Sequence, residues 1–282
     1  MTSLLTHAQW VLAIAAIAGL AIGSFLNVVI HRLPRMLERQ WQDDAAALRG
    51  EPLENAARYD LMRPRSHCPA CSRTLRLRDL VPVASWLALR GRCASCSARI
   101  SARYPAVELI TALLFMLCIA RFGTGFTAAA AMLLVAVLLA AALIDLDTQL
   151  LPDALTLPLV WAGLLVNLGG WFAPLDDAVI GAVAGYLSLW TIHHAFRALA
   201  GREGMGYGDF KLLAAIGAWL GWQVLPAIVL IASAAGAGFA IAAAAIGRRD
   251  ARQAIAFGPW LAGAGTLALF AGPSLAGWLG FA

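Results

Sequence analysis

Two aspartates stand where long apolar stretches of this sequence meet polar ones. Asp145 closes one apolar stretch, and Asp209 follows Gly206 and Gly208 at the beginning of another. Ionisable residues in membrane spans are costly and usually have a function. Two carboxylates brought together share a proton, because adjacent like charges cannot both ionise cheaply. The charged one then activates water while the protonated one polarises a carbonyl, which is the chemistry of aspartic peptidases.

Taken singly, these aspartates have simpler explanations. The helix dipole favours a carboxylate in the first turn of a helix, so Asp209 taken alone is expected to be a helix-capping residue. Asp145 and Asp147 are two residues apart and point to roughly opposite helix faces, so only one should face a helix bundle. Asp153 follows Pro152, which ends the preceding helix, and is expected to be a structural first-turn acid.

The residues around Asp209 suggest how it is used. Gly206 and Gly208 lack side chains, so we expect them to let the backbone of an extended substrate approach, or to adopt positive φ values. Lys211 is the single lysine of the chain. It either tunes the carboxylate pair or extends its ammonium to the membrane interface.

Four further residues have the spacing of metal ligands. "CPAC" and "CASC" are two C-x-x-C turns separated by 21 residues, and each can present two thiolates to one tetrahedral ion. The pattern predicts one structural zinc, with iron in a rubredoxin-like site as the remaining possibility. Disulfides are disfavoured because the charge pattern places this segment in the reducing cytoplasm. The predicted ligands are Cys68, Cys71, Cys93 and Cys96, whereas Cys118 should simply pack among apolar residues.

The composition requires membrane helices to position these residues. Of 282 residues, 61% are hydrophobic and 13% charged, whereas soluble domains are about half apolar and about a quarter charged. A span needs about 20 apolar residues. We expect eight spans, the sixth of them short, near 8–30, 105–121, 125–145, 153–170, 177–198, 210–221, 224–246 and 254–280. The predicted fold is an all-α polytopic membrane protein, with 1–30 as the first transmembrane helix, 31–104 as a four-cysteine, zinc-binding insert and 105–282 as the helix bundle.

Basic residues predict the orientation. Residues 31–104 hold 14 of the 21 Lys and Arg residues, all of them Arg. Cytoplasmic loops carry this excess, so the insert should be cytoplasmic and the N-terminus periplasmic. The first apolar run lacks a basic segment before it and a cleavage site after it, and is expected to be a retained span. Since the insert also holds seven acidic residues, we expect no nucleic-acid partner.

Several segments, in this order, resemble the bacterial type IV prepilin peptidases, which are membrane aspartic peptidases of the G-x-G-D type. The resemblance implies that Asp145 and Asp209 are catalytic, with Gly206 and Gly208 in support. Asp147 occupies a position that the family allows to be basic, so it should be dispensable. The segments are "GSFLNVVIHRLP" (23–34), the Cys-containing loop running into "ARYPAVEL", "LIDLDTQLLPD" (143–153) and "GMGYGDFKLLAAIGAWLG" (204–221).

The resemblance also implies the substrates. These are precursors of type IV pilins and of the pseudopilins of type II secretion, cut after a glycine at the cytoplasmic face of the bacterial inner membrane. It further implies methylation of the new N-terminus with S-adenosylmethionine, for which the sequence shows no cofactor loop. The residues that we expect to contribute lie at the mouth of the insert: Asn27, Arg32, Gly91, Tyr104 and Glu108.

Other roles remain open for these residues and for the whole chain. Asn27 can make an interhelical hydrogen bond, Arg32 can anchor the cytoplasmic end of its helix, and Glu108 can pair with an arginine. A proton-coupled transporter would use both aspartates as a relay, but this does not explain the insert. A catalytically silent zinc-ribbon anchor would leave both aspartates replaceable.

Overall fold

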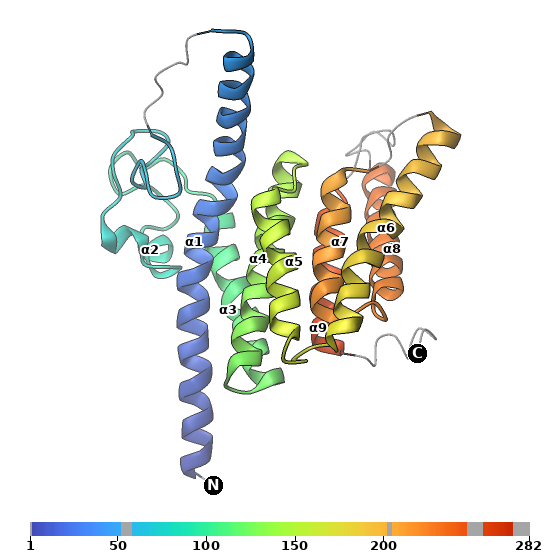
Figure 1. Ribbon diagram of the computed structural model, residues 1–282. Coiled ribbons are helices and arrows are strands. Elements are labelled where there is room, and N and C mark those ends of the chain that lie inside the picture. The colour runs from blue at the N-terminus through green and yellow to red at the C-terminus, as the bar shows by residue number, and fades with distance from the viewer. Residues whose placement is uncertain (1, 52–57, 202–204, 247–255, 273–282) are drawn as a thin grey trace. The chain divides into compact units, whose positions relative to one another are not determined.

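The computed structural model describes residues 2–51, 58–201, 205–246 and 256–272 of the chain (Figure 1). It divides into two compact units, residues 1–124 and residues 125–282. Within the described residues the regular structure is helical, as the sequence predicts for an all-α membrane protein. Each of the eight predicted spans coincides with a helix, although both ends of the last one, 254–280, lie outside the described residues.

The first unit consists of two long helices and the Cys-containing insert. Its helices pack closely through glycines, because a Cβ added at Gly19 would lie 2.5 Å from Cα of Ala112, and one at Gly23 would lie 2.7 Å from Cα of Glu108. The elements are α1 (Thr2–Leu48), η1 (Leu77–Leu80), α2 (Ala84–Ala88) and α3 (Arg103–Phe122).

Helix α1 continues well past residue 30, where the sequence predicts its span to end. Its 47 residues make a helix about 70 Å long, whereas the hydrocarbon core of a bilayer is about 30 Å thick. The C-terminal part of α1, "PRMLERQWQDDAAAL", is polar and charged. One continuous helix therefore contains both a membrane span and the beginning of the insert.

The second unit packs around its shortest helices. Helix α7 contacts α5, α6 and α9, and most of its residues from Asp209 to Trp219 are buried. The elements are α4 (Phe126–Thr148), α5 (Asp153–Asn167), α6 (Leu175–Ala200), α7 (Tyr207–Leu220), α8 (Leu225–Ala245) and α9 (Gly258–Ala271).

Two polar side chains hold α5 against the end of α7. Asn167 donates to the carbonyls of Ala218 and Trp219 and accepts the N–H groups of Phe172 and Ala173, so its buried amide is fully used. The indole of Trp219 donates to the carbonyl of Leu159 at 2.8 Å. These bonds satisfy backbone groups that membrane lipid cannot. They fix the depth of α7 and thereby the position of Asp209 at its other end.

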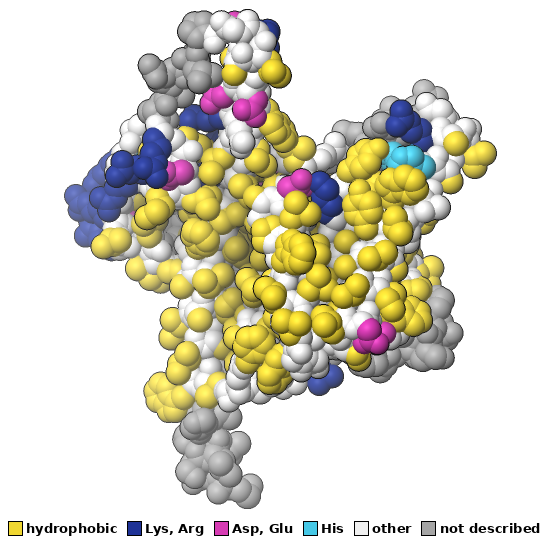
Figure 2. Space-filling view, viewed as in Figure 1, with side chains coloured by type: hydrophobic (Ala, Val, Ile, Leu, Met, Phe, Trp, Pro, Cys, Tyr) yellow, Lys and Arg dark blue, Asp and Glu magenta, His cyan; other side chains and the backbone are white. Residues whose placement is uncertain are grey.

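Among the described residues, five helices are long and apolar enough to cross a membrane: Gln9–Leu48, Arg103–Phe122, Phe126–Thr148, Leu175–Ala200 and Leu225–Ala245. Helices α5, α7 and α9 have 15, 14 and 14 residues. At a rise of 1.5 Å per residue they are about 21–23 Å long, shorter than the hydrocarbon core. Apolar side chains cover the outer surface of α5 and α6, as expected of faces in contact with lipid (Figure 2).

Candidate active site

Asp145 is anchored by the N-terminus of another helix. It lies near the end of α4, is 5% exposed, and its Oδ2 accepts the backbone N–H of Gly258 at 2.9 Å. Gly258 is the first residue of α9. The first N–H groups of a helix lack partners within it and carry a partial positive charge, so a carboxylate is a favourable partner. A Cβ on Gly258 would lie 2.6 Å from that Oδ2, which leaves glycine as the residue that fits.

Asp209 is also buried, but its hydrogen bonding differs from that of Asp145. It is the third residue of α7 and is 6% exposed. Its Oδ1 has no hydrogen-bond partner in the described part of the chain. The carboxylate of Asp145 is close enough to act on it electrostatically. A buried polar atom without a partner is costly, and such atoms are rare in folded proteins except where function requires them.

Leu151 lies against the segment that carries Asp209 and against the helix terminus that anchors Asp145. A Cβ added at Gly208 would be 2.6 Å from Cβ of Leu151, and one at Gly258 would be 3.2 Å from its Cδ1. The sequence suggested that Gly208 leaves room for a substrate backbone. In the structure Leu151 fills the space beside Gly208. Within the described part of the chain, a Cβ added at Gly206 would meet only Oδ2 of Asp209, at 3.9 Å. Its φ of −78° also needs no glycine.

The other charged residues of these segments, Asp147, Asp153 and Lys211, lie away from the aspartate pair. Asp147 is exposed, in contrast to the buried Asp145 two residues earlier on α4. Lys211 donates to both carboxylate oxygens of Asp153, at 2.6 and 2.8 Å, and so joins α7 to α5. Two residues along a helix are about 200° apart, so Lys211 projects from the face of α7 opposite Asp209.

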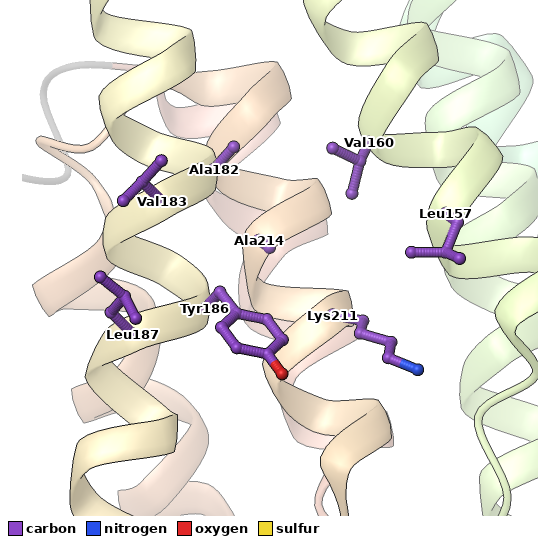
Figure 3. Close-up of a pocket in the computed structure, with 8 residues that line it drawn as sticks. All are labelled: Leu157, Val160, Ala182, Val183, Tyr186, Leu187, Lys211 and Ala214. Atoms are coloured by element: carbon purple, nitrogen blue, oxygen red, sulfur yellow. The ribbon is translucent and has the colours of Figure 1, made fainter.

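A groove of about 430 Å³ lies between α5 and α6, with α7 as its floor (Figure 3). Lys211 and Tyr186 supply its polar atoms, and its other lining residues are Leu157, Val160, Ala182, Val183, Leu187 and Ala214. Ala214 is five residues after Asp209, about 140° around α7. The groove thus belongs to the other side of α7 and is separate from the aspartate pair.

The four cysteines of the insert come together as the spacing predicts. All four sulfur atoms lie within 4.8 Å of one another, and Sγ of Cys68 is 3.8 Å from Sγ of Cys96. Two thiolates bound to one tetrahedral zinc at about 2.3 Å would be about 3.8 Å apart. Bridges between His67 and Thr74 and between Arg92 and Arg99 close the two C-x-x-C turns.

One of these thiols is suited to deprotonation even without an ion. Hydrogen bonds from the backbone N–H groups of Cys96 and Ser95 lower the pKa of Cys93 to about 6. The thiolate is the form of cysteine that binds metal. The chemistry of this donor set therefore fits a closed four-sulfur metal site.

The residues that the resemblance links to methylation divide into separate groups. Asn27 donates to the carbonyls of Gly23 and Tyr104, and Glu108 accepts the N–H of Val83 at 2.7 Å, so these residues join α1, α3 and the insert. The sequence predicted an arginine as a partner of Glu108, whereas the structure shows the backbone N–H of Val83, whose φ is +60°.

Arg32 and Gly91 have other surroundings. Arg32 is buried and donates to the carbonyls of Asp60, Leu61 and Pro64, so its guanidinium organises a turn of the insert. Gly91 has a φ of +66°, and a Cβ there would lie 2.9 Å from the ring of Trp86. Asn27, Glu108 and Arg32 all form hydrogen bonds within the protein. These bonds do not by themselves support a methyl-donor site at these residues.

Three residues near the aspartates had no role in the sequence analysis. "FGPW" places a proline in the first turn of α9, which is a helix-start signal, but nothing local links Gly258 to Asp145. Leu151 carries no signal at all, because it is an ordinary apolar residue. His193 is 2% exposed, and neither ring nitrogen has a partner in the described residues.

Comparison with known proteins is consistent with this arrangement. Residues 17–122 match the model of the bacterial peptidase A24 N-terminal domain, and residues 132–241 match that of the type IV leader peptidase family. A prepilin leader peptidase/N-methyltransferase from Aeromonas salmonicida is 54% identical over 263 residues, which are 92% of this chain and 90% of the relative. The corresponding proteins of Dickeya chrysanthemi and Pseudomonas putida are 53% and 48% identical, over 92% and 97% of this chain and 92% and 95% of the relatives. No solved structure matches the chain.

Proposed function

Because the chain belongs to the type IV leader peptidase family, we infer that it removes the leader of prepilins and methylates the N-terminus so exposed. It is a membrane-embedded enzyme with two activities. We assign the hydrolysis to Asp145 and Asp209. The observation that carries this assignment is the burial of two carboxylates within electrostatic range of each other, one bonded to Gly258 and the other with an unpartnered oxygen.

The pair can hydrolyse a peptide bond by acid–base catalysis. One carboxylate accepts a proton from a water molecule as that water attacks the scissile carbonyl carbon. The other, protonated, donates a hydrogen bond to the carbonyl oxygen. Collapse of the tetrahedral intermediate breaks the C–N bond, and a proton returns to the leaving amine. Oδ2 of Asp145 is already bonded to Gly258, which keeps the carboxylate in one orientation while water is bound.

The finer assignments are proposals from the sequence. Pseudopilins of type II secretion are a second substrate class. The enzyme lies in the inner membrane, and the Arg excess of the insert supports a topology in which the aspartates and the cleavage are on the cytoplasmic side. Zinc is the metal that suits Cys68, Cys71, Cys93 and Cys96, where it would hold the two turns together as a structural ion. S-adenosylmethionine is the methyl donor, and the residues proposed from the sequence for this activity are Asn27, Arg32, Gly91, Tyr104 and Glu108.

Co-expression with a type IV prepilin tests the assignment. The intact mass of the product is compared for the parent enzyme, Asp145→Asn, Asp209→Asn and the matched control Asp147→Asn. We expect leader removal by the parent and the control and none by the other two. The added mass of one methyl group on the mature product reports the second activity. An uncut prepilin with a folded parent enzyme would favour the transporter or the zinc-ribbon anchor. Cleavage by both buried-aspartate variants would refute the catalytic pair.

A further inference from the structure

Leu151 lies beside the two glycines that adjoin the aspartate pair, Gly208 and Gly258. It lies in the short connection between α4, which ends at Thr148, and α5, which begins at Asp153. Its tip reaches Gly258, whose N–H holds Asp145, and its Cβ rests on Gly208, which directly precedes Asp209. The side chain therefore lies between the N-terminus of α9, which anchors Asp145, and the beginning of α7, which carries Asp209.

The connection that carries Leu151 is held at both ends. The N–H of Gln149 donates to the carbonyl of Asp145 at 2.9 Å and closes α4 with a left-handed residue. On the other side, the carbonyl of Pro152 accepts the N–H groups of Leu155 and Thr156. Leu151 is one residue from Pro152 and two from Gln149. Its backbone thus has little freedom, and its side chain keeps a defined place beside the carboxylates.

The glycines on either side of Leu151 explain how it comes so close. A methyl group at Gly208 would collide with Cβ of Leu151, and one at Gly258 would crowd its Cδ1 as well as Asp145. Leu151 is only partly buried, so the remainder of its apolar surface stays accessible next to the two carboxylates. A scissile carbonyl seated between those carboxylates brings the neighbouring substrate side chain against that surface.

We propose that Leu151 is a specificity-determining residue: its side chain forms the apolar wall of the subsite for a substrate side chain adjacent to the scissile bond. The length of this wall limits the size of the side chain accepted there. The inference rests on the proposed function and adds to it the feature by which the site selects its cleavage position.

Competition between substrates tests this role. Prepilins with Gly, Ala or Val at either residue flanking the scissile bond are mixed pairwise, and the ratio of kcat/KM values is measured for the full-length parent, Leu151→Ala and Leu151→Phe. One methylene in an apolar pocket changes selectivity by about 10–200-fold. We therefore expect Leu151→Ala to raise the relative kcat/KM of the larger side chain at one flanking position by about tenfold or more, and Leu151→Phe to lower it.

Matched variants separate selection from folding. Leu157→Ala removes an accessible leucine from the groove on the other side of α7 and should keep the parental ratios. Leu151→Val loses one methylene and serves if Leu151→Ala does not fold. Unchanged ratios at both flanking positions, or an equal loss of rate for all substrates, would overturn the proposal while the peptidase assignment stands. A folded parent that cleaves no prepilin would instead overturn the proposed function, and this inference with it.

Discussion

The backbone N–H of Gly258 and the Oδ2 of Asp145, 113 residues apart in the sequence, are joined by a buried hydrogen bond of 2.9 Å. The N-terminus of α9 is thereby directed at the carboxylate that ends α4. Such a donor both satisfies a helix terminus and restrains the rotation of the carboxylate. The aspartate pair thus depends on α9 as well as on the helices that carry the aspartates.

Replacing Gly258 by alanine should disable cleavage without unfolding the enzyme. The added Cβ would lie 2.6 Å from Oδ2 of Asp145 and must displace it. Misplacement of a catalytic group by about 1 Å costs about a hundredfold in rate, and we expect a loss of that order in the initial rate of prepilin cleavage. Gly263→Ala, in the same helix, is the matched control, because its Cβ would meet no other described residue within 4 Å. Equal rates for the two variants would contradict the role of Gly258.

The two glycines before Asp209 should respond differently to alanine. Gly208→Ala should destabilise the protein, because its Cβ would lie 2.6 Å from Cβ of Leu151, and Leu151→Gly in the same chain should restore the thermal stability. Gly206→Ala meets only an ordinary contact with Asp209 and should fold normally. If a substrate passes beside Gly206, its alanine variant raises KM with unchanged stability. An unaltered KM would remove Gly206 from the substrate path.

The ion pair between Lys211 and Asp153 should matter for stability and not for catalysis. It joins α5 to α7 on the face away from Asp209, and Asp153 is more than half exposed. Partly exposed pairs contribute about 0.2–1 kcal/mol. A double-mutant cycle with Lys211→Met and Asp153→Asn should return a coupling in this range, with the pH profile of cleavage unchanged. A profile shifted by Lys211→Met and not by Asp153→Asn would show that Lys211 acts on the aspartate pair.

The insert should carry one metal ion per chain, and we expect zinc. Cys71→Ser removes one of four converging sulfur atoms and should lower the metal content of the purified protein and loosen the insert toward proteases. Cys118→Ser is the control, because Cys118 is buried in α3 away from the sulfur cluster. Iron in place of zinc would change the assigned metal. A parent protein without metal would refute the site.

His193 should be replaceable at a gain in stability. Its buried ring packs near Tyr207 and Phe210, with centroid distances of 5.4 and 5.5 Å, and its nitrogens lack partners in the described residues. A buried group left without a hydrogen bond costs about 1–3 kcal/mol, so His193→Leu should raise the unfolding temperature. His194→Leu, which loses a hydrogen bond to the carbonyl of Trp190, should not. A destabilised His193→Leu would mean that the ring has a partner in the folded chain.

Features that depend on neighbours along the chain can be predicted from the sequence alone. Apolar runs of sufficient length predict the helices, and the two C-x-x-C turns predict a cluster whose sulfur atoms the structure brings together. The order of the motifs pointed to Asp145 and Asp209 through resemblance. Helix periodicity alone left Asp145 and Asp147 equivalent, and the structure distinguishes them by burying the first and exposing the second.

Which groups meet across helices becomes visible in the folded chain and not in the sequence. Nothing near Gly258 in the sequence indicates that its N–H bonds to Asp145, or that Lys211 pairs with Asp153 and Glu108 with the N–H of Val83. These pairings depend on the rotation and depth at which each helix packs. Close approaches of glycines and bonds such as those of Asn167 set these two quantities. Leu151 is the clearest case, since an unremarkable leucine in a short connection becomes part of the site only where α4, α7 and α9 converge.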